Sequence, residues 1–122
     1  LVTMNDTTYV EAARLLAKRV METAPDPADR ISLAFRLTTG RLPTDEESQL
    51  LIRRQKQLQA RFGEIPERSH EFLSVGETPW RGGPAERTQT PTMDDERKAA
   101  SELASYTTVC LTLLNLDEAL NK

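Results

Sequence analysis

Paired carboxylates are the first feature of this 122-residue chain that could do chemistry. They occur in three groups, Asp45–Glu47, Asp94–Glu96 and Asp117–Glu118. A glycosidase places two such groups across a cleft, whereas adjacent acids at a helix start act as caps and dipole partners. The first two groups fit that structural role. Asp117 and Glu118 fall at a predicted helix C-terminus, where the dipole disfavours anions, so we expect an arginine partner there.

One cysteine and one histidine limit metal, redox and nucleophilic chemistry. Cys110 has no second thiol for an internal disulfide, and with His70 it supplies too few ligands for a standard zinc site. Its neighbours Val109 and Leu111 indicate a buried, inert thiol. His70 lies among polar residues, and the sequence names no partner that would orient it as a general base. We therefore assign no catalytic residue, no cofactor and no metal site.

Two arginines near an apolar helical face suggest a structural polar cluster. Arg36 and Arg41 flank the end of that face, where a guanidinium is usually paired or multiply hydrogen-bonded. The candidate acceptors come from both ends of the chain and are Asn5, Asp6, Asn115 and Asp117. We hypothesise that Arg36 or Arg41 ties the beginning of the chain to its end through these residues.

Trp80 is the candidate interface residue. It lies in the segment Pro79-Trp80-Arg81-Gly82-Gly83, which has no apolar periodicity. A tryptophan in such a segment either pins the segment to its own domain or contacts another domain or ligand. Both interpretations stay open on the sequence.

A basic stretch is the only feature that resembles a nucleic-acid site. Four cations, Arg53, Arg54, Lys56 and Arg61, follow a helix and a turn, as in a helix-turn-helix. The same predicted helix begins with three acids that a phosphate backbone would repel. Solvated surface is the simpler interpretation, and we expect no nucleic-acid partner.

The elements that position these residues have helical periodicity. Apolar residues recur at spacings of three and four from Tyr9 to Val20, which marks one apolar stripe. This spacing predicts a helix over about 7–23, with Arg14 off that stripe or on its edge.

A second helix has a start signal and an end signal. Asp26 suits the N-cap and Pro27 the first helical position. Gly40 supplies the left-handed residue that commonly closes a helix. These signals predict a helix near 27–39.

The middle of the chain contains a third helix, a short fourth helix and a loop. Thr44 and Glu47 form a capping box, and the helix that they start should end near residue 62. A short helix is predicted over 66–74. Residues 77–93 are rich in proline, glycine and threonine and predict a long flexible loop.

The last helix should begin at Thr92 or Asp94 and reach about residue 120. No stretch alternates long enough to predict a strand. The predicted fold is all-α, an irregular bundle of four to five helices with one long loop before the C-terminal helix. Residues 1–122 would form a single domain.

Charge and hydropathy exclude several classes of protein. The chain has 16 basic and 19 acidic residues, a balance that argues against a strong nucleic-acid footprint. No apolar run approaches the ~18 residues of a membrane span, so membrane insertion is not expected. The first six residues lack the features of a signal peptide. Because Leu1 is not an initiator Met, we expect a fragment of a larger protein.

Several stretches resemble one known family. Residues 1–13 resemble a "LNDPxFVEAA" segment, and residues 34–47 resemble "AFRLxLGRxPTxxE". Residues 75–79, VGETP, resemble a "VGESP" element, and residues 115–118, NLDE, resemble the closing "LLNLDEFL". The family is the C-terminal region of large planctomycete proteins that often carry a cytochrome c domain, and this region is of unknown function.

The resemblance implies a context for the chain. It implies a multidomain protein of the periplasm, the cell envelope or the secreted fraction, in which any haem belongs to another domain. We expect a non-catalytic structural or interaction domain whose partners are other domains of the same parent chain. The alternative is an accessory part of an active site that upstream domains complete, for example one that acts on polysaccharide.

Overall fold

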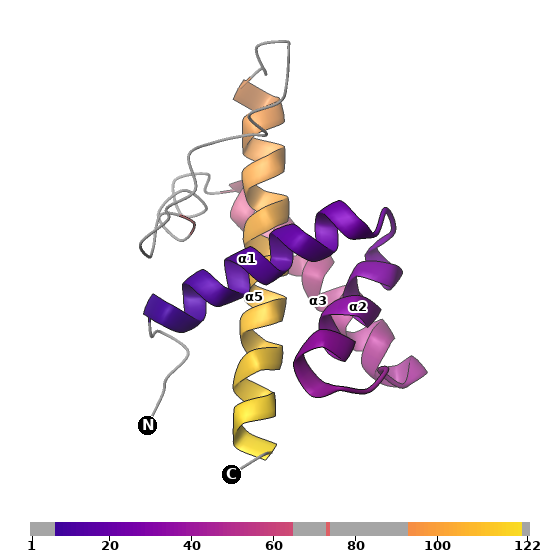
Figure 1. The fold of residues 1–122 in the computed structure, drawn as a ribbon. Coiled ribbons are helices and arrows are strands. Elements are labelled where there is room, and N and C mark those ends of the chain that lie inside the picture. Colours follow the sequence, from indigo (N-terminus) through magenta and orange to yellow (C-terminus); the bar gives the residue numbers. More distant parts are fainter. Residues whose placement is uncertain (1–6, 65–72, 74–92, 121–122) are drawn as a thin grey trace.

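Four α-helices make up the described part of the chain (Figure 1). The computed structural model describes the backbone of residues 7–64, 73 and 93–120, and the side chains of 8–64, 73 and 98–116. The helices are α1 (Thr7–Thr23), α2 (Pro27–Thr39), α3 (Asp45–Glu64) and α5 (Met93–Leu120). No strand occurs in these ranges. The all-α prediction is confirmed.

The predicted short helix and the predicted loop lie mostly outside the described residues. The helix over 66–74 lies outside the described residues apart from Leu73, which is helical and fully buried. The loop over 77–93 lies outside them apart from Met93, which begins α5. Both therefore stay predictions.

Local signals position α2 as the sequence predicts. Asp26 occupies the N-cap with an extended backbone, and Pro27 follows it as the first helical residue. The Asp26 side chain makes no capping hydrogen bond, but its carbonyl accepts one from the Arg30 amide at 2.9 Å. At the other end Gly40 has φ +82°, and its amide donates to the Arg36 carbonyl at 2.9 Å. A left-handed glycine thus ends the helix.

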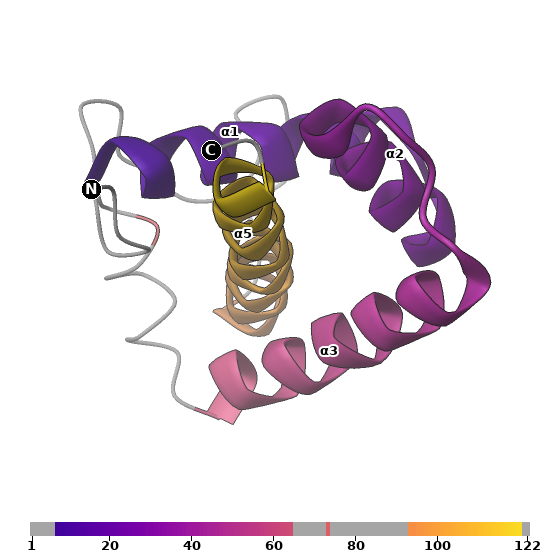
Figure 2. The same cartoon turned by 90° about the horizontal axis from the view of Figure 1, so that it is seen from below.

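The long helix α5 lies in the middle of the fold. Figure 2 looks along it and shows α1 on one side and α3 on the other, with α2 beside them. The contacts agree, because α5 packs mainly against α1 and α3 and to a lesser extent against α2. A helix that is covered on several sides needs apolar or small residues around most of its circumference. This placement explains why α5 contributes much of the core.

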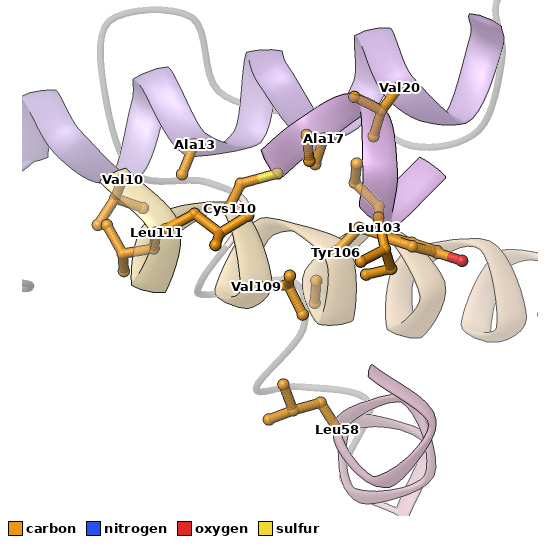
Figure 3. Packing of buried hydrophobic residues seen from close by; sticks show 14 of the residues in the cluster. Val10, Ala13, Ala17, Val20, Leu58, Leu103, Tyr106, Val109, Cys110 and Leu111 are labelled. Carbon is orange, nitrogen blue, oxygen red and sulfur yellow. The ribbon is translucent and has the colours of Figure 1, made fainter. Parts of the chain in front are cut away.

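The core forms where α1 and α5 cross. Figure 3 shows Ala13 and Ala17 of α1 facing Cys110 of α5 and Val10 of α1 beside Leu111, while Leu58 comes from the α3 side. Alanines at the crossing allow the two helix backbones to approach closely. The buried apolar residues are Val10, Ala13, Ala17, Val20, Ala24, Ile31, Ala34, Phe35, Leu58, Leu73, Ala100, Leu103, Ala104, Tyr106, Val109, Cys110, Leu111 and Leu113.

The described helices have a length and polarity that bear on membrane spanning. Each of them is too short or too polar to cross a bilayer as a single span.

Candidate functional site

The turn between α2 and α3 holds a closely organised ion pair. Arg41 Nη1 donates to Glu47 Oε1 at 2.9 Å, and Nη2 donates to Oε2 at 3.0 Å. This is the two-pronged geometry in which a guanidinium binds a carboxylate most strongly. The Arg41 guanidinium also lies 4.7 Å from the centre of the Phe35 ring, a distance typical of a cation–π contact.

The same carboxylate closes the predicted capping box at the start of α3. The Thr44 amide donates to Glu47 Oε1 at 2.9 Å, and the Glu47 amide donates to Thr44 Oγ1 at 3.2 Å. Each of these bonds satisfies an amide that the helix start would otherwise leave unpaired. Glu47 therefore joins the turn and the first turn of α3 at one point.

These contacts change the ionisation of Glu47. The hydrogen bond from Arg41, followed by that from the Thr44 backbone, lowers the pKa of the Glu47 carboxyl from 4.5 to about 2. The hydrogen bond to Glu47 in turn raises the pKa of Arg41. The Arg41 side chain is 54% exposed and that of Glu47 35%. Solvent screens such a pair, so its role is to order the turn locally.

The structure describes only some residues of the polar cluster predicted around Arg36 and Arg41. Arg41 pairs with Glu47, Arg36 is exposed in the last turn of α2, and Asn115 is partly buried on α5. The remaining predicted residues that lie outside the described side chains are Asn5, Asp6, His70, Trp80, Asp117 and Glu118. The link between the two chain ends and the role of Trp80 therefore stay predictions.

Arg30 is the centre of a second polar group, which joins three helices. Its Nε donates to the Ala24 carbonyl at 2.7 Å, and its Nη2 donates to the Met21 carbonyl at 3.4 Å. Both carbonyls belong to the C-terminal end of α1, where the last carbonyls lack partners and the dipole favours a cation. The last turn of α1 itself contains no basic residue. Arg30 of α2 supplies the missing charge.

The other side of the Arg30 guanidinium meets α5. Nη1 lies 3.3 Å from Glu102 Oε1, and the guanidinium carbon lies 5.4 Å from the centre of the Tyr106 ring. Burial raises the pKa of the Tyr106 hydroxyl, and the neighbouring Arg30 offsets part of that rise. One side chain thus connects the end of α1 and the start of α2 to α5.

Arg14 is a third buried anchor, and its placement differs from the prediction. The sequence placed Arg14 off the apolar stripe of α1 or on its edge, but the residue is only 4% exposed. Its Nη1 donates to the Leu73 carbonyl at 2.6 Å, and its Nη2 lies 3.8 Å from Glu11. The apolar stem of an arginine can enter a core when its charged end finds such partners.

Gln55 makes the buried polar contact between α3 and α5. The residue is 2% exposed, and its Nε2 donates to Ser105 Oγ at 3.0 Å and to Gln59 Oε1 at 2.8 Å. Gln55 lies on the inward side of α3 together with Leu58. Its partner on α5 lies 50 positions away, so no local pattern identifies it.

Cys110 is buried, as its neighbours predict. The thiol points toward α1 in Figure 3, and the residue is 1% exposed. Burial raises the pKa of the thiol to about 12. The thiolate, which is the reactive form, is therefore scarce near neutral pH.

Two sequence signals could have found the anchors that were not predicted. Arg14 is four residues after Val10 and three before Ala17, which places it on the buried side of a helix. Arg30 lies one turn into α2, close to a helix end that lacks its own cation. Neither signal names the partner residue, because each partner comes from another element.

The buried polar side chains of the described residues are satisfied within the protein. Within them, every buried side-chain nitrogen or oxygen has a hydrogen-bond partner. Across the same residues no group of three or more His, Cys, Asp or Glu side chains could hold a metal ion. The interior polar groups that are described connect helices to each other.

Comparison with known proteins gives one match. Residues 1–54 match the family model "PSD1: Protein of unknown function (DUF1553)". The PSD1 match spans α1, α2, the Arg41–Glu47 turn and the first half of α3. It confirms, over these residues, the predicted resemblance to a domain of unknown function. No match was found among the curated proteins or among the solved structures.

Proposed function

We propose that this chain is a non-catalytic helical domain of a larger protein, in which it supports or contacts the other domains. The observation that carries the proposal is the set of hydrogen bonds that Arg30 makes inside the protein. Its guanidinium is committed to two carbonyls at the end of α1 and to Glu102 of α5. A binding or catalytic arginine presents its donors to a ligand, whereas the donors of Arg30 bind groups of neighbouring helices.

Two further polar groups support the same proposal. Arg14 donates to the Leu73 carbonyl, and Gln55 donates to Ser105 of α5. Each contact joins segments that are far apart in sequence. Buried polar groups with all their partners inside the protein make the packing specific, which suits a rigid supporting domain.

The cellular context of the proposal comes from the family resemblance. Large planctomycete proteins with a cytochrome c domain place such a region at the C-terminus, in the periplasm, the cell envelope or the secreted fraction. In a parent protein of this kind, another domain would hold the haem, and this region would need no cofactor. The partners of the region would be the domains that precede it.

The test measures association between this chain and the rest of its parent protein. The two parts are produced as separate polypeptides, and their complex is followed by sedimentation velocity. A one-to-one complex, with no turnover of polysaccharide by this chain alone, is the expected result. Two parts that do not associate, or turnover by this chain alone, would overturn the proposal.

A further inference from the structure

The outward face of α3 carries an uninterrupted positive charge. Between Glu47 and Glu64 the sequence contains no acid. The basic residues of this stretch are Arg53, Arg54, Lys56 and Arg61, and all four are exposed. Throughout the described side chains, the ion pairs that form involve other arginines. These four cations are therefore available to a partner.

Helix geometry places the four cations on one side of α3. Gln55 and Leu58 are buried against the rest of the fold, which defines the inward side of the helix. With about 100° between successive residues, the four cations fall within an arc of roughly 160° on the opposite side. Leu50 lies on the same side and is 61% exposed. The face, defined by Leu50 and the four cations, is continuous and faces solvent.

We propose that this α3 face is an interaction surface for a short acidic segment of the domains that precede this region in its parent protein. Three of its four cations are arginines, whose planar donors bind carboxylates in pairs. The exposed Leu50 offers one apolar contact at the end of the face, a combination typical of protein interfaces. The inference deepens the proposed function, on which it rests, by naming the surface and the chemistry of the partner.

The two ends of the face favour a short peptide over a long polyanion. Glu46 and Glu64 are both exposed, and they lie on the same side of α3 because they are about five helical turns apart. A phosphate backbone that continued along the helix would meet carboxylates at both ends of the face. The basic stretch from Leu50 to Arg61 measures about 17 Å, which matches about five residues of extended peptide.

The chain offers a matched control for a test of this surface. Lys18 and Arg19 of α1 are also adjacent, exposed cations. The variants R53E/R54E and K18E/R19E therefore change the net charge equally on two different helices. Arg61 is left unchanged because it lies in the last turn of α3, where a cation also favours the helix dipole. Circular dichroism and thermal unfolding of both variants check that the fold is retained.

The experiment measures binding of a fluorescein-labelled, 12-residue peptide with four glutamates and one leucine, at an ionic strength of about 0.15 M. An oligothymidylate of equal charge serves as the second probe. We expect R53E/R54E to weaken peptide binding by about tenfold or more and K18E/R19E by less than about threefold. Equal losses in the two variants, absent peptide binding, or tighter binding of the oligonucleotide would overturn the inference.

A second measurement separates this inference from the proposed function. R53E/R54E is tested for association with the rest of the parent protein, as described above for the unaltered chain. Loss of that complex in R53E/R54E but not in K18E/R19E supports both proposals. If R53E/R54E associates as the unaltered chain does, the α3 inference fails while the proposed function stands. If the unaltered chain does not associate, the proposed function fails.

Discussion

Arg30 Nη1 lies 3.3 Å from Glu102 Oε1, and this contact connects α2 to α5 across 72 positions of the sequence. The contact is one part of a larger arrangement, since the same guanidinium caps the C-terminal end of α1. A side chain that bridges three helices should matter more for stability than the ion pair alone.

Replacement of Arg30 tests this arrangement. R30M keeps the apolar stem but removes the donors to the end of α1, so we expect the free energy of unfolding to fall by about 2 kcal/mol. E102Q removes only the partly exposed charge and should lower the free energy of unfolding by less than about 1 kcal/mol. Urea unfolding followed by circular dichroism measures both values. Equal losses in the two variants would show that the ion pair, and not the cap, dominates.

The lowered pKa of Glu47 predicts how the stability of the turn depends on pH. The carboxyl titrates at about 2 in the folded chain and near 4.5 when unperturbed. Since the folded value is the lower one, the stabilisation is complete above 4.5 and is lost as the pH falls toward about 2. E47Q lacks this titration. The melting temperatures of the unaltered chain and E47Q should converge on acidification, and a constant difference would contradict the assignment.

Gly40 and Gly63 form a matched pair for a test of backbone conformation. A Cβ added at either position meets no atom within 4 Å, but only Gly40 has a positive φ, at +82°. G40A should therefore destabilise the chain by about 1–2 kcal/mol. G63A, which lies inside α3, should stabilise it by up to about 1 kcal/mol. Chemical unfolding measures both, and two changes of the same sign would contradict the left-handed role of Gly40.

The burial of Cys110 predicts a protected thiol. Because its pKa is raised to about 12, modification by Ellman's reagent near neutral pH should be slow in the folded chain. The same chain unfolded in urea should react at the rate of a free cysteine. The ratio of the two rates measures how often the α1–α5 contact opens. Equal rates in both states would show that the thiol is accessible.

The helix ends show what short-range patterns can predict. The capping box of Thr44 and Glu47 and the left-handed Gly40 both act within four residues of the chain, so local sequence suffices to identify them. The sequence suggests acceptors for Arg41 only at the two ends of the chain. In the structure Arg41 pairs with Glu47, only six residues further on.

The sequence by itself determined the all-α class, the approximate bounds of four helices and most of the apolar side of α1, because these depend on periodicity and on capping over one turn. The tertiary structure alone decided which polar groups that are distant in the sequence meet. The hydrogen bonds from Arg14 to Leu73, from Arg30 to Glu102 and from Gln55 to Ser105 join residues that are 50 to 72 positions apart. Such pairs depend on how α5 crosses its neighbours, and the crossing depends on the packing of all the helices together.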